Sequence, residues 1–328
     1  GLKYFLLGAF SSAFFLFGIA MVYGGAGSVN LIAIQSAIGV DGAGSNLLLE
    51  AGMGLLLVGF GFKVAAIPFH MWTPDAYEGA PAPVTAFMAA AVKAAAFAAF
   101  LRVFLTAFSG MYATWFALVA LLAFATMIGA NLIALAEDSV KRMLAYSSIA
   151  HAGYLLVAVA ARNEIGTAAF LYYLIVYTLM TMGAFAVVYL VAQKQELRLG
   201  LAEYGGLGWK VPVVGITMTV FLFSLAGVPP TGGFWGKFAI LRAIVERDKV
   251  WLAVTLVLTS LVSYYYYLRV AWYMWFREPD DAVADREVTV SRGVQIVLVT
   301  AAIAVLLLGI FPGQILELAQ ESAAALLQ

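Results

Sequence analysis

The sequence predicts an all-α polytopic integral membrane protein, a helical bundle with about nine transmembrane helices. Three observations predict this class. Of the 328 residues, 64% are hydrophobic and only 11% are charged, whereas a soluble domain carries about 25% charged residues. The mean hydropathy is +0.97. The apolar residues form continuous runs rather than the alternating pattern of a membrane β-barrel.

Nine apolar runs are long enough to cross a bilayer, because one crossing takes about 20 helical residues. These runs cover 2–23, 49–78, 81–108, 111–136, 141–161, 166–193, 212–246, 250–277 and 291–311. A short amphipathic tail follows at 313–327. We therefore expect helices throughout and no spanning strand.

Two of the runs are interrupted, which predicts two discontinuous helices. Pro68 removes an amide donor within "VAAIPFHMWTP", and "SLAGVPPTGGFWGKF" places Pro229 and Pro230 in mid-run. Broken backbone at membrane depth is tolerated only where it faces protein or water. The broken runs are the second and the seventh, so they should point in opposite directions, as in an inverted repeat.

If each repeat has five helices, the second covers about 111–277 and a C-terminal helix follows at about 291–311. The first repeat would then lack two helices at its N-terminus. Since the chain also begins at Gly1 without an initiator Met, we expect 1–328 to be a single, N-terminally incomplete transmembrane domain.

The distribution of Lys and Arg in the connections predicts the orientation. One set of connections holds Lys141, Arg142, Lys194, Arg198, Lys210, Arg277, Arg286 and Arg292, and the opposite set holds Arg162, Arg247 and Lys249. The richer side should be cytoplasmic, with the loops at 194–211 and 278–292 inside. The C-terminal tail, which has no basic residue, should lie outside.

Composition also excludes several kinds of site. The formal net charge is zero, which gives no indication of a nucleic-acid partner. Without cysteine the chain has no disulfide and no cysteine-ligated cluster. A bis-histidine haem would need both His70 and His151, and no other feature supports one. No nucleotide-binding or hydrolase motif is present.

Most charged residues fall in connections or near the ends of the runs, but Lys63, Lys93, Lys237 and His151 do not. Lys93 lies 12 residues into its run, which is about 18 Å deep at 1.5 Å per residue. The others also fall near the predicted midplane, so the four would form a row along the membrane plane. An intramembrane lysine costs roughly 2.5–3.5 kcal/mol on insertion scales, which makes such a row a candidate proton path.

No Asp or Glu lies at mid-helix to pair with these lysines. Either Lys63 is often neutral or its carboxylate partner precedes Gly1, and both states suit a group that gains and loses a proton. For Lys237 we expect the amides at the start of the second half-helix to disfavour the ammonium form.

Structural alternatives accompany each of these interpretations. A buried lysine can be one member of a structural ion pair, and His151 can be a hydrogen-bonded structural histidine. The simplest interpretation of Tyr264 to Tyr267, Trp272 and Trp275 is core and aromatic-belt packing.

Three stretches carry a family resemblance: "GFKVAAIPFHMWTPDAYEGAPAPVTAFM", "NLIALAEDSVKRMLAYSSIAHAGYLL" and "SLAGVPPTGGFWGKFAIL". They resemble the antiporter-like membrane subunits of respiratory complex I, the NADH–quinone oxidoreductase. Within that family "WTPDAYEGAPAPV" and the lysine of "GFWGKF" resemble the subunit N branch, the counterpart of mitochondrial subunit 2. The resemblance covers essentially the whole chain, from the family's sixth transmembrane helix to its last.

By this resemblance Lys63 corresponds to the key lysine of a broken helix, Lys93 to a connecting lysine and Lys237 to a terminal lysine. His151 resembles a histidine of the linking polar chain. The family pairs the first lysine with a glutamate on an earlier helix, which would account for the missing carboxylate.

The resemblance implies proton translocation across the bacterial inner membrane, coupled to quinone reduction in other subunits. It implies no cofactor in this chain, since NADH, FMN, iron–sulfur clusters and quinone belong to those subunits. The implied partners are other complex I membrane subunits, lipid and protons. The alternatives are an Mrp-type cation/proton antiporter subunit and subunit 2 of a photosynthetic-type complex.

Overall fold

The computed structural model describes residues 1–40, 42, 44–192, 200–278 and 290–327, and every regular element in these ranges is a helix. In chain order they are α1 (Leu2–Ala26), α2 (Leu31–Ile38), α3 (Leu47–Val64), α4 (Thr73–Gly79), α5 (Ala82–Phe87), η1 (Met88–Val92), α6 (Lys93–Arg102), η2 (Val103–Ala107), η3 (Ser109–Met111), α7 (Tyr112–Leu135), α8 (Val140–Ala161), α9 (Glu164–Ala192), η4 (Ala202–Tyr204), α10 (Leu207–Lys210), α11 (Pro212–Ala226), α12 (Gly232–Val245), α13 (Val250–Phe276), α14 (Arg292–Ile310) and α15 (Gly313–Leu327).

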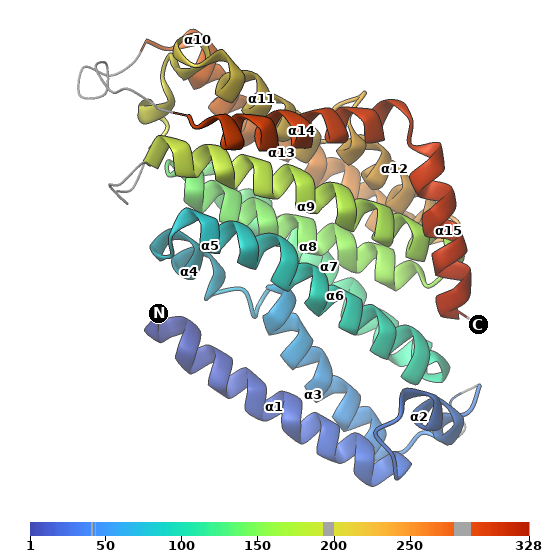
Figure 1. Cartoon of the computed structure of the whole chain (residues 1–328). Helices are drawn as coiled ribbons and strands as arrows, with labels where there is room; N and C mark the ends of the chain where they lie inside the picture. The colour runs from blue at the N-terminus through green and yellow to red at the C-terminus, as the bar shows by residue number, and fades with distance from the viewer. Residues whose placement is uncertain (41, 43, 193–199, 279–289, 328) are drawn as a thin grey trace.

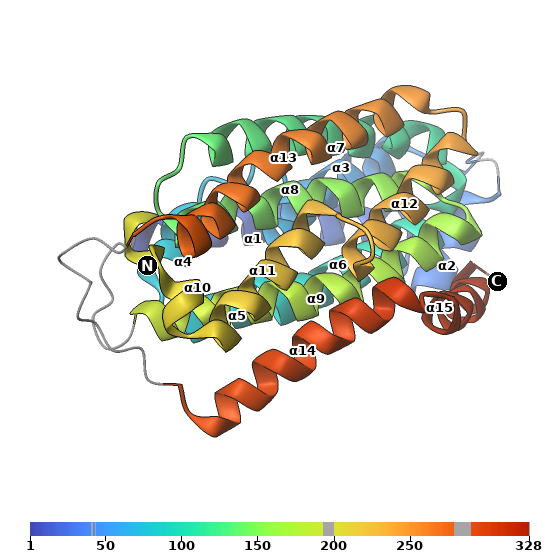
Figure 2. The same cartoon turned by 90° about the horizontal axis from the view of Figure 1, so that it is seen from above.

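The predicted all-α membrane fold is confirmed. Eight helical stretches of the described chain are long and apolar enough to cross a membrane, and a pair bent by 116° at Lys210–Pro212 raises the number to nine. The long helices lie side by side and run back and forth between two ends of the bundle (Figures 1 and 2). One end carries α4 and α10, and the other carries α2 and the C-terminus.

Helix α8 forms the centre of the bundle, because its whole membrane-spanning window is buried. It packs against α7 and α9 and also against α4, α12 and α13. The side chain of Ser139 caps its first turn by accepting a hydrogen bond from the Arg142 amide at 3.2 Å, and serine is among the preferred residues at that position. A polar residue within that window of α8 therefore meets only protein.

The second predicted run breaks at Ala65, three residues before the proline, Pro68, at which the sequence predicted the break. Helix α3 has 18 residues before Ala65 adopts a left-handed φ of 63°, so α3 is long enough to span by itself. Lys63 therefore lies in the last turn of α3 rather than in the middle of a helix. The indole of Trp72 donates to the Phe62 carbonyl at 3.1 Å, and the Thr126 hydroxyl accepts from the Ile67 amide at 2.9 Å. Protein groups thus form hydrogen bonds with the backbone groups that the break leaves without helical partners, as a membrane environment requires.

The seventh predicted run is broken at mid-length, as expected. Helix α11 has 15 residues and α12 has 14, and Gly227 between them has a φ of 90°. The Ser224 hydroxyl accepts from the Gly233 amide at 3.1 Å, which joins the two half-helices. In Figure 1 α3 and α11 run in opposite directions. The five-helix repeat itself stays a prediction.

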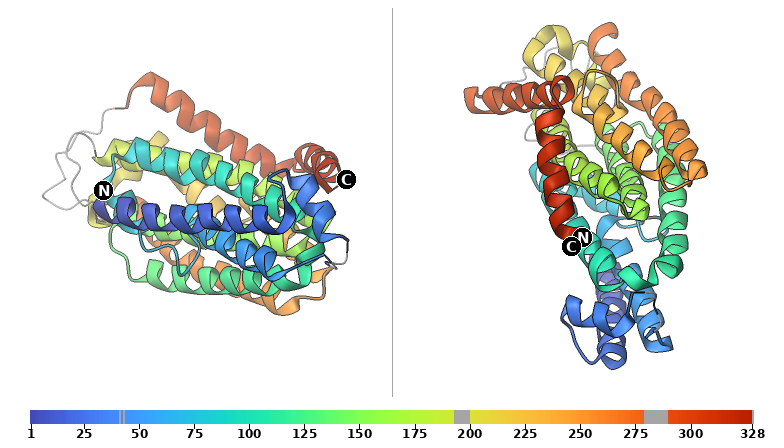
Figure 3. Two further views of the ribbon diagram at one scale, coloured as in Figure 1. Left: turned by 90° about the horizontal axis from the view of Figure 1, so that it is seen from below. Right: turned by 90° about the vertical axis from the view of Figure 1, so that its right-hand side faces the viewer.

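The N-terminal pair α1 and α3 forms one edge of the bundle, and the end-on view shows an elongated cross-section with this pair at one extremity (Figure 3, right). Only 17% of the spanning window of α1 is buried. Its contact with α3 depends on small residues: a Cβ added to Gly52 would lie 2.9 Å from the Gly18 carbonyl oxygen. Such close approach is typical of helix pairs in membranes.

We predict that Gly52→Val separates α1 from α3, whereas Gly54→Val does not. Both glycines lie on α3 and lose the same backbone freedom, but a Cβ at Gly54 meets no atom within 4 Å. Overpacking typically costs about 1–3 kcal/mol. Apparent melting temperature in detergent checks this, and equal loss in both variants would show that the close approach is unimportant.

We also predict that 194–211 and 278–292 face the cytoplasm and that α15 lies outside. The 193–199 and 279–289 segments fall outside the described residues, but η4 and α15 lie at opposite ends of the bundle (Figure 1). Because the chain has no cysteine, single cysteines at the exposed positions Ala202 and Gln320 can be labelled selectively. In intact cells an impermeant maleimide should label position 320 only, and labelling of position 202 would reverse the orientation.

Candidate functional site

Lys237 lies in the second turn of α12, close to the break after α11, and is 5% exposed. Its ammonium donates to the carbonyls of Leu225 and Ala226, both at 2.9 Å. These carbonyls belong to the C-terminal turn of α11, where unsatisfied oxygens favour a cation. The sequence predicts that the amides at the start of α12 disfavour the ammonium form. The side chain instead reaches back to the carbonyls at the end of the preceding half-helix.

Lys93 is 2% exposed and begins α6 directly after the π-helical turn η1. Its ammonium donates to the carbonyl of Ser148 at 2.7 Å and to the hydroxyl of the same residue at 2.6 Å. The hydroxyl of Tyr177 donates to that serine hydroxyl at 2.8 Å. Turns of π-helix occur often at functional sites, and here the turn immediately precedes the charged residue.

His151 lies in the middle of α8 and is 1% exposed. Its Nδ1 shares a hydrogen bond with the hydroxyl of Tyr173 at 2.5 Å, and its Nε2 shares one with Tyr267 at 3.0 Å. The Tyr267 hydroxyl also hydrogen-bonds the Ser147 hydroxyl. Both ring nitrogens are thus bound to hydroxyls that can donate or accept a proton.

Tyr154 connects the histidine with the terminal lysine. Its ring lies 5.4 Å from the His151 ring, and the Lys237 ammonium lies 4.8 Å from the Tyr154 ring centroid. Buried cation–π contacts of this kind stabilise a desolvated ammonium. The Asn131 amide donates to the Tyr154 hydroxyl at 3.4 Å, and the Tyr266 hydroxyl donates to Asn131 at 2.8 Å.

The fold therefore gathers three of the four predicted residues around α8. Ser148 accepts from Lys93, one turn of α8 places His151 next, and one further turn places Tyr154 against Lys237. Lys63 stands apart, since its side chain is exposed on α3 and none of the contacts above reaches it. His70, in the break after α3, has a buried Nδ1 that lacks a hydrogen-bond partner among the described residues.

Several polar partners in this network did not stand out in the sequence. Tyr267 was assigned to core and belt packing, and its ring is indeed fully buried, yet its hydroxyl joins Ser147 to His151. A sequence signal existed: Ser148, His151 and Tyr154 recur every three residues and Ser147 precedes His151 by four, which places them on one side of an otherwise apolar stretch of helix. Tyr173 and Tyr177, four residues apart, give the matching pattern on α9.

The groups gathered around α8 are of the kinds that can gain and lose protons. They are hydroxyls and an imidazole on α8 and its neighbours, the Lys93 amine on α6 and the Lys237 amine on α12. In the described part of the chain the five ion pairs all lie outside this network. The same residues contain no group of three or more potential metal ligands.

Comparison with known proteins places the chain among membrane complex subunits. The sequence matches the family described as "NADH:quinone oxidoreductase/Mrp antiporter, TM" over residues 1–263. It is 50% identical to NADH-quinone oxidoreductase subunit N of Trichlorobacter lovleyi, covering 98% of this chain and 66% of the relative. It is 46% identical to NADH-quinone oxidoreductase subunit N 1 of Solibacter usitatus, covering 99% and 66%. The chain thus spans just under two thirds of the length of these curated relatives.

Solved structures show the same fold. A chain of respiratory complex I from Thermus thermophilus with bound aureothin superposes with a TM-score of 0.83 at 40% identity, covering 96% of this chain and 67% of that one. A chain of the Mrp complex from Dietzia sp. gives a TM-score of 0.88, covering 99% and 67%. At 22% identity the latter likeness shows the fold alone.

We predict that Tyr267→Phe destabilises the protein and Tyr265→Phe does not. The first change leaves Ser147 and the His151 Nε2 without their buried partner, and an unsatisfied buried polar group costs about 1–3 kcal/mol. Tyr265 lies on the same helix but is 60% exposed. Thermal unfolding in detergent gives the comparison, and matching melting temperatures would mean that the Tyr267 hydroxyl has no part in the network.

Proposed function

The chain belongs to the NADH:quinone oxidoreductase/Mrp antiporter transmembrane family, and from this premise we propose that it is a proton-translocating membrane subunit, of the subunit N type, of an NADH–quinone oxidoreductase. It would move protons from cytoplasm to periplasm across the bacterial inner membrane. NADH oxidation and quinone reduction, with FMN and iron–sulfur clusters, would belong to other subunits. Its partners would be the other complex I membrane subunits, the lipid bilayer and the protons themselves.

The observation that carries the proposal is that both lysines and the histidine meet on one buried helix. Lys93 donates to Ser148, His151 is bonded to two tyrosine hydroxyls, and Lys237 contacts the ring of Tyr154. In this mechanism Lys93 and Lys237 hold or release protons at Nζ, and His151 passes a proton between its two nitrogens and the bound hydroxyls. Lys63 would be the residue at which protons enter the row, on the α3 side. This role rests on the resemblance of its motif to the family. Charge changes in neighbouring subunits would drive the protonation cycle.

The geometry at Lys237 suits a group that alternates between two protonation states. With its proton the amine is stabilised by two carbonyls and an aromatic ring. After losing it the amine would keep N–H donors for the same carbonyls, so that the end of α11 remains satisfied. A guanidinium would hold its proton too tightly to take part.

We predict that Lys237→Gln and Lys237→Arg both abolish most proton pumping by the intact complex in inside-out membrane vesicles. Glutamine cannot carry the proton, and arginine cannot release it. Lys249→Gln, at a basic residue outside the network, is the control, and expression and assembly are checked for each variant. Full pumping in the Gln variant would remove Lys237 from the path, whereas full pumping in the Arg variant alone would leave it as a fixed charge.

The same vesicles distinguish the proposed redox-coupled function from the alternative, a cation/proton antiporter. A cation/proton antiporter subunit would exchange Na⁺ or K⁺ for H⁺ when an ion gradient is imposed without NADH. A redox-coupled subunit would acidify the vesicle lumen only when NADH and a quinone are supplied. The identities of 50% and 46% to subunit N relatives favour the second result.

A further inference from the structure

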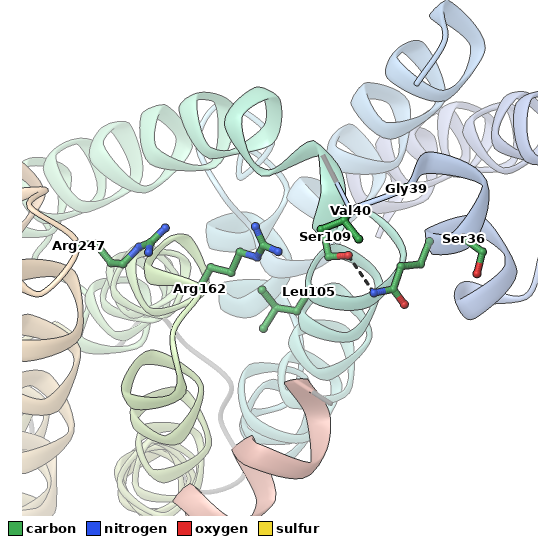
Figure 4. Close-up of a pocket in the computed structure, with 8 residues that line it drawn as sticks. Ser36, Gly39, Val40, Leu105, Ser109, Arg162 and Arg247 are labelled. Carbon is green, nitrogen blue, oxygen red and sulfur yellow. Dashed lines mark hydrogen bonds between the residues drawn. The ribbon is translucent and has the colours of Figure 1, made fainter. Parts of the chain in front are cut away.

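A polar cavity lies at the end of the bundle opposite α4 and α10, far from the charged residues of the central network. Its volume is about 630 Å³, and its walls come from α2, η2 and η3 and from the ends of α8 and α12. Figure 4 shows the guanidinium groups of Arg162 and Arg247 on one side of it and Ser109 with its hydrogen-bond partner Gln35 on the other. Leu105 and Val40 add an apolar part to the lining.

Two positive charges are held close together in this cavity. The Cζ of Arg162 lies 5.0 Å and that of Arg247 5.2 Å from the centroid of the same Tyr112 ring. The Tyr112 hydroxyl donates to the Ala160 carbonyl at 2.8 Å, which fixes the ring that both guanidiniums contact. Arg162 itself ends α8 with a left-handed φ of 42°. Residues other than glycine rarely adopt that conformation. The surrounding fold therefore holds the Arg162 backbone in this geometry at the end of α8.

No carboxylate balances these charges in the described part of the chain. The acidic residues nearest in sequence are Glu164, Glu246 and Asp248, and none of them forms an ion pair with either arginine there. Glu246 instead pairs with Arg242 at 3.2 Å. Burial lowers the pKa of the Arg162 guanidinium below its usual value, and the charge of Arg247 acts in the same direction. Two neighbouring guanidiniums without a counter-ion repel each other, and an anion between them would remove that repulsion.

We propose that this cavity is a binding site for a phosphate group, held by Arg162 and Arg247 with Ser109 and Gln35 as further hydrogen-bonding partners. Guanidiniums bind phosphate through two parallel N–H donors, which makes them the preferred partners of such groups. The group can come from a phospholipid headgroup or from free phosphate. The position at the end of the spanning helices, with Leu105 and Val40 in the wall, suits a headgroup whose acyl chains extend along the bundle.

The test is native mass spectrometry of the full-length polypeptide purified in detergent and titrated with phosphatidylglycerol, with phosphatidylcholine or with inorganic phosphate alone. We expect the double variant Arg162→Gln/Arg247→Gln to bind phosphatidylglycerol about tenfold or more weakly. Arg162→Lys/Arg247→Lys should lose less, since it keeps the charge but not the paired donors. Lys249→Gln is the matched control, because Lys249 makes the same kind of contact with a ring, that of Phe116 at 5.2 Å, but does not line the cavity.

The outcomes decide both the site and the source of the group. Binding of phosphatidylglycerol that inorganic phosphate in excess does not displace identifies a lipid site, whereas displacement with retained binding of phosphate identifies free phosphate. Unchanged binding in the double Gln variant, or an equal loss in Lys249→Gln, would overturn the proposal. If the double variant fails to fold, Arg247→Gln alone decides in the same way, since Arg247 is exposed, and a loss of threefold or more supports the site.

Discussion

The structure depends on how the bundle stabilises ammonium groups without carboxylates. Lys93 and Lys237 are both almost completely buried, and burying a charge is costly unless it is hydrogen-bonded. For Lys237 the end of a broken helix supplies the acceptors, because the last carbonyls of α11 have no partner within their own helix. For Lys93 the acceptors are the carbonyl and the hydroxyl of Ser148. Neutral acceptors leave each amine able to exist in either protonation state.

This requirement explains why α8 lies at the centre. A helix that is surrounded by protein can carry a stripe of serine, histidine and tyrosine, whereas a lipid-facing helix cannot. Hydroxyls in this stripe find partners on other helices, as Ser147 does with Tyr267 and Ser148 with Tyr177. Polar contacts between helices of this kind add specificity to a bundle whose remaining contacts are apolar. The network that would carry protons therefore also fixes how α8, α9 and α13 are placed.

The helix breaks and the close glycine contacts also help to place the buried polar groups. At both breaks side chains hydrogen-bond the backbone groups that have lost their helical partners. Trp72 and Thr126 do so after α3, and Ser224 does so before α12. Gly236 faces the Tyr173 ring so closely that a Cβ would overlap it, which lets α12 approach α9 and bring Lys237 near the network. Of the two arginines beside Tyr112, Arg162 ends α8 and Arg247 follows α12, so the central helix also positions one charge at the end of the bundle.

The sequence by itself determined the helical class, the approximate spans and the identities of Lys93, His151 and Lys237 as buried ionisable residues. These follow from run length and composition, since a bilayer imposes a fixed crossing length and a high cost on charge. Only the tertiary structure decided the partners. That Lys237 reaches back to Leu225 and Ala226, that Tyr267 bonds His151, and that Lys63 ends α3 with an exposed side chain all depend on contacts between residues distant in the chain. Periodicity reports which side of a helix is polar, but it carries no information about which other helix that side meets.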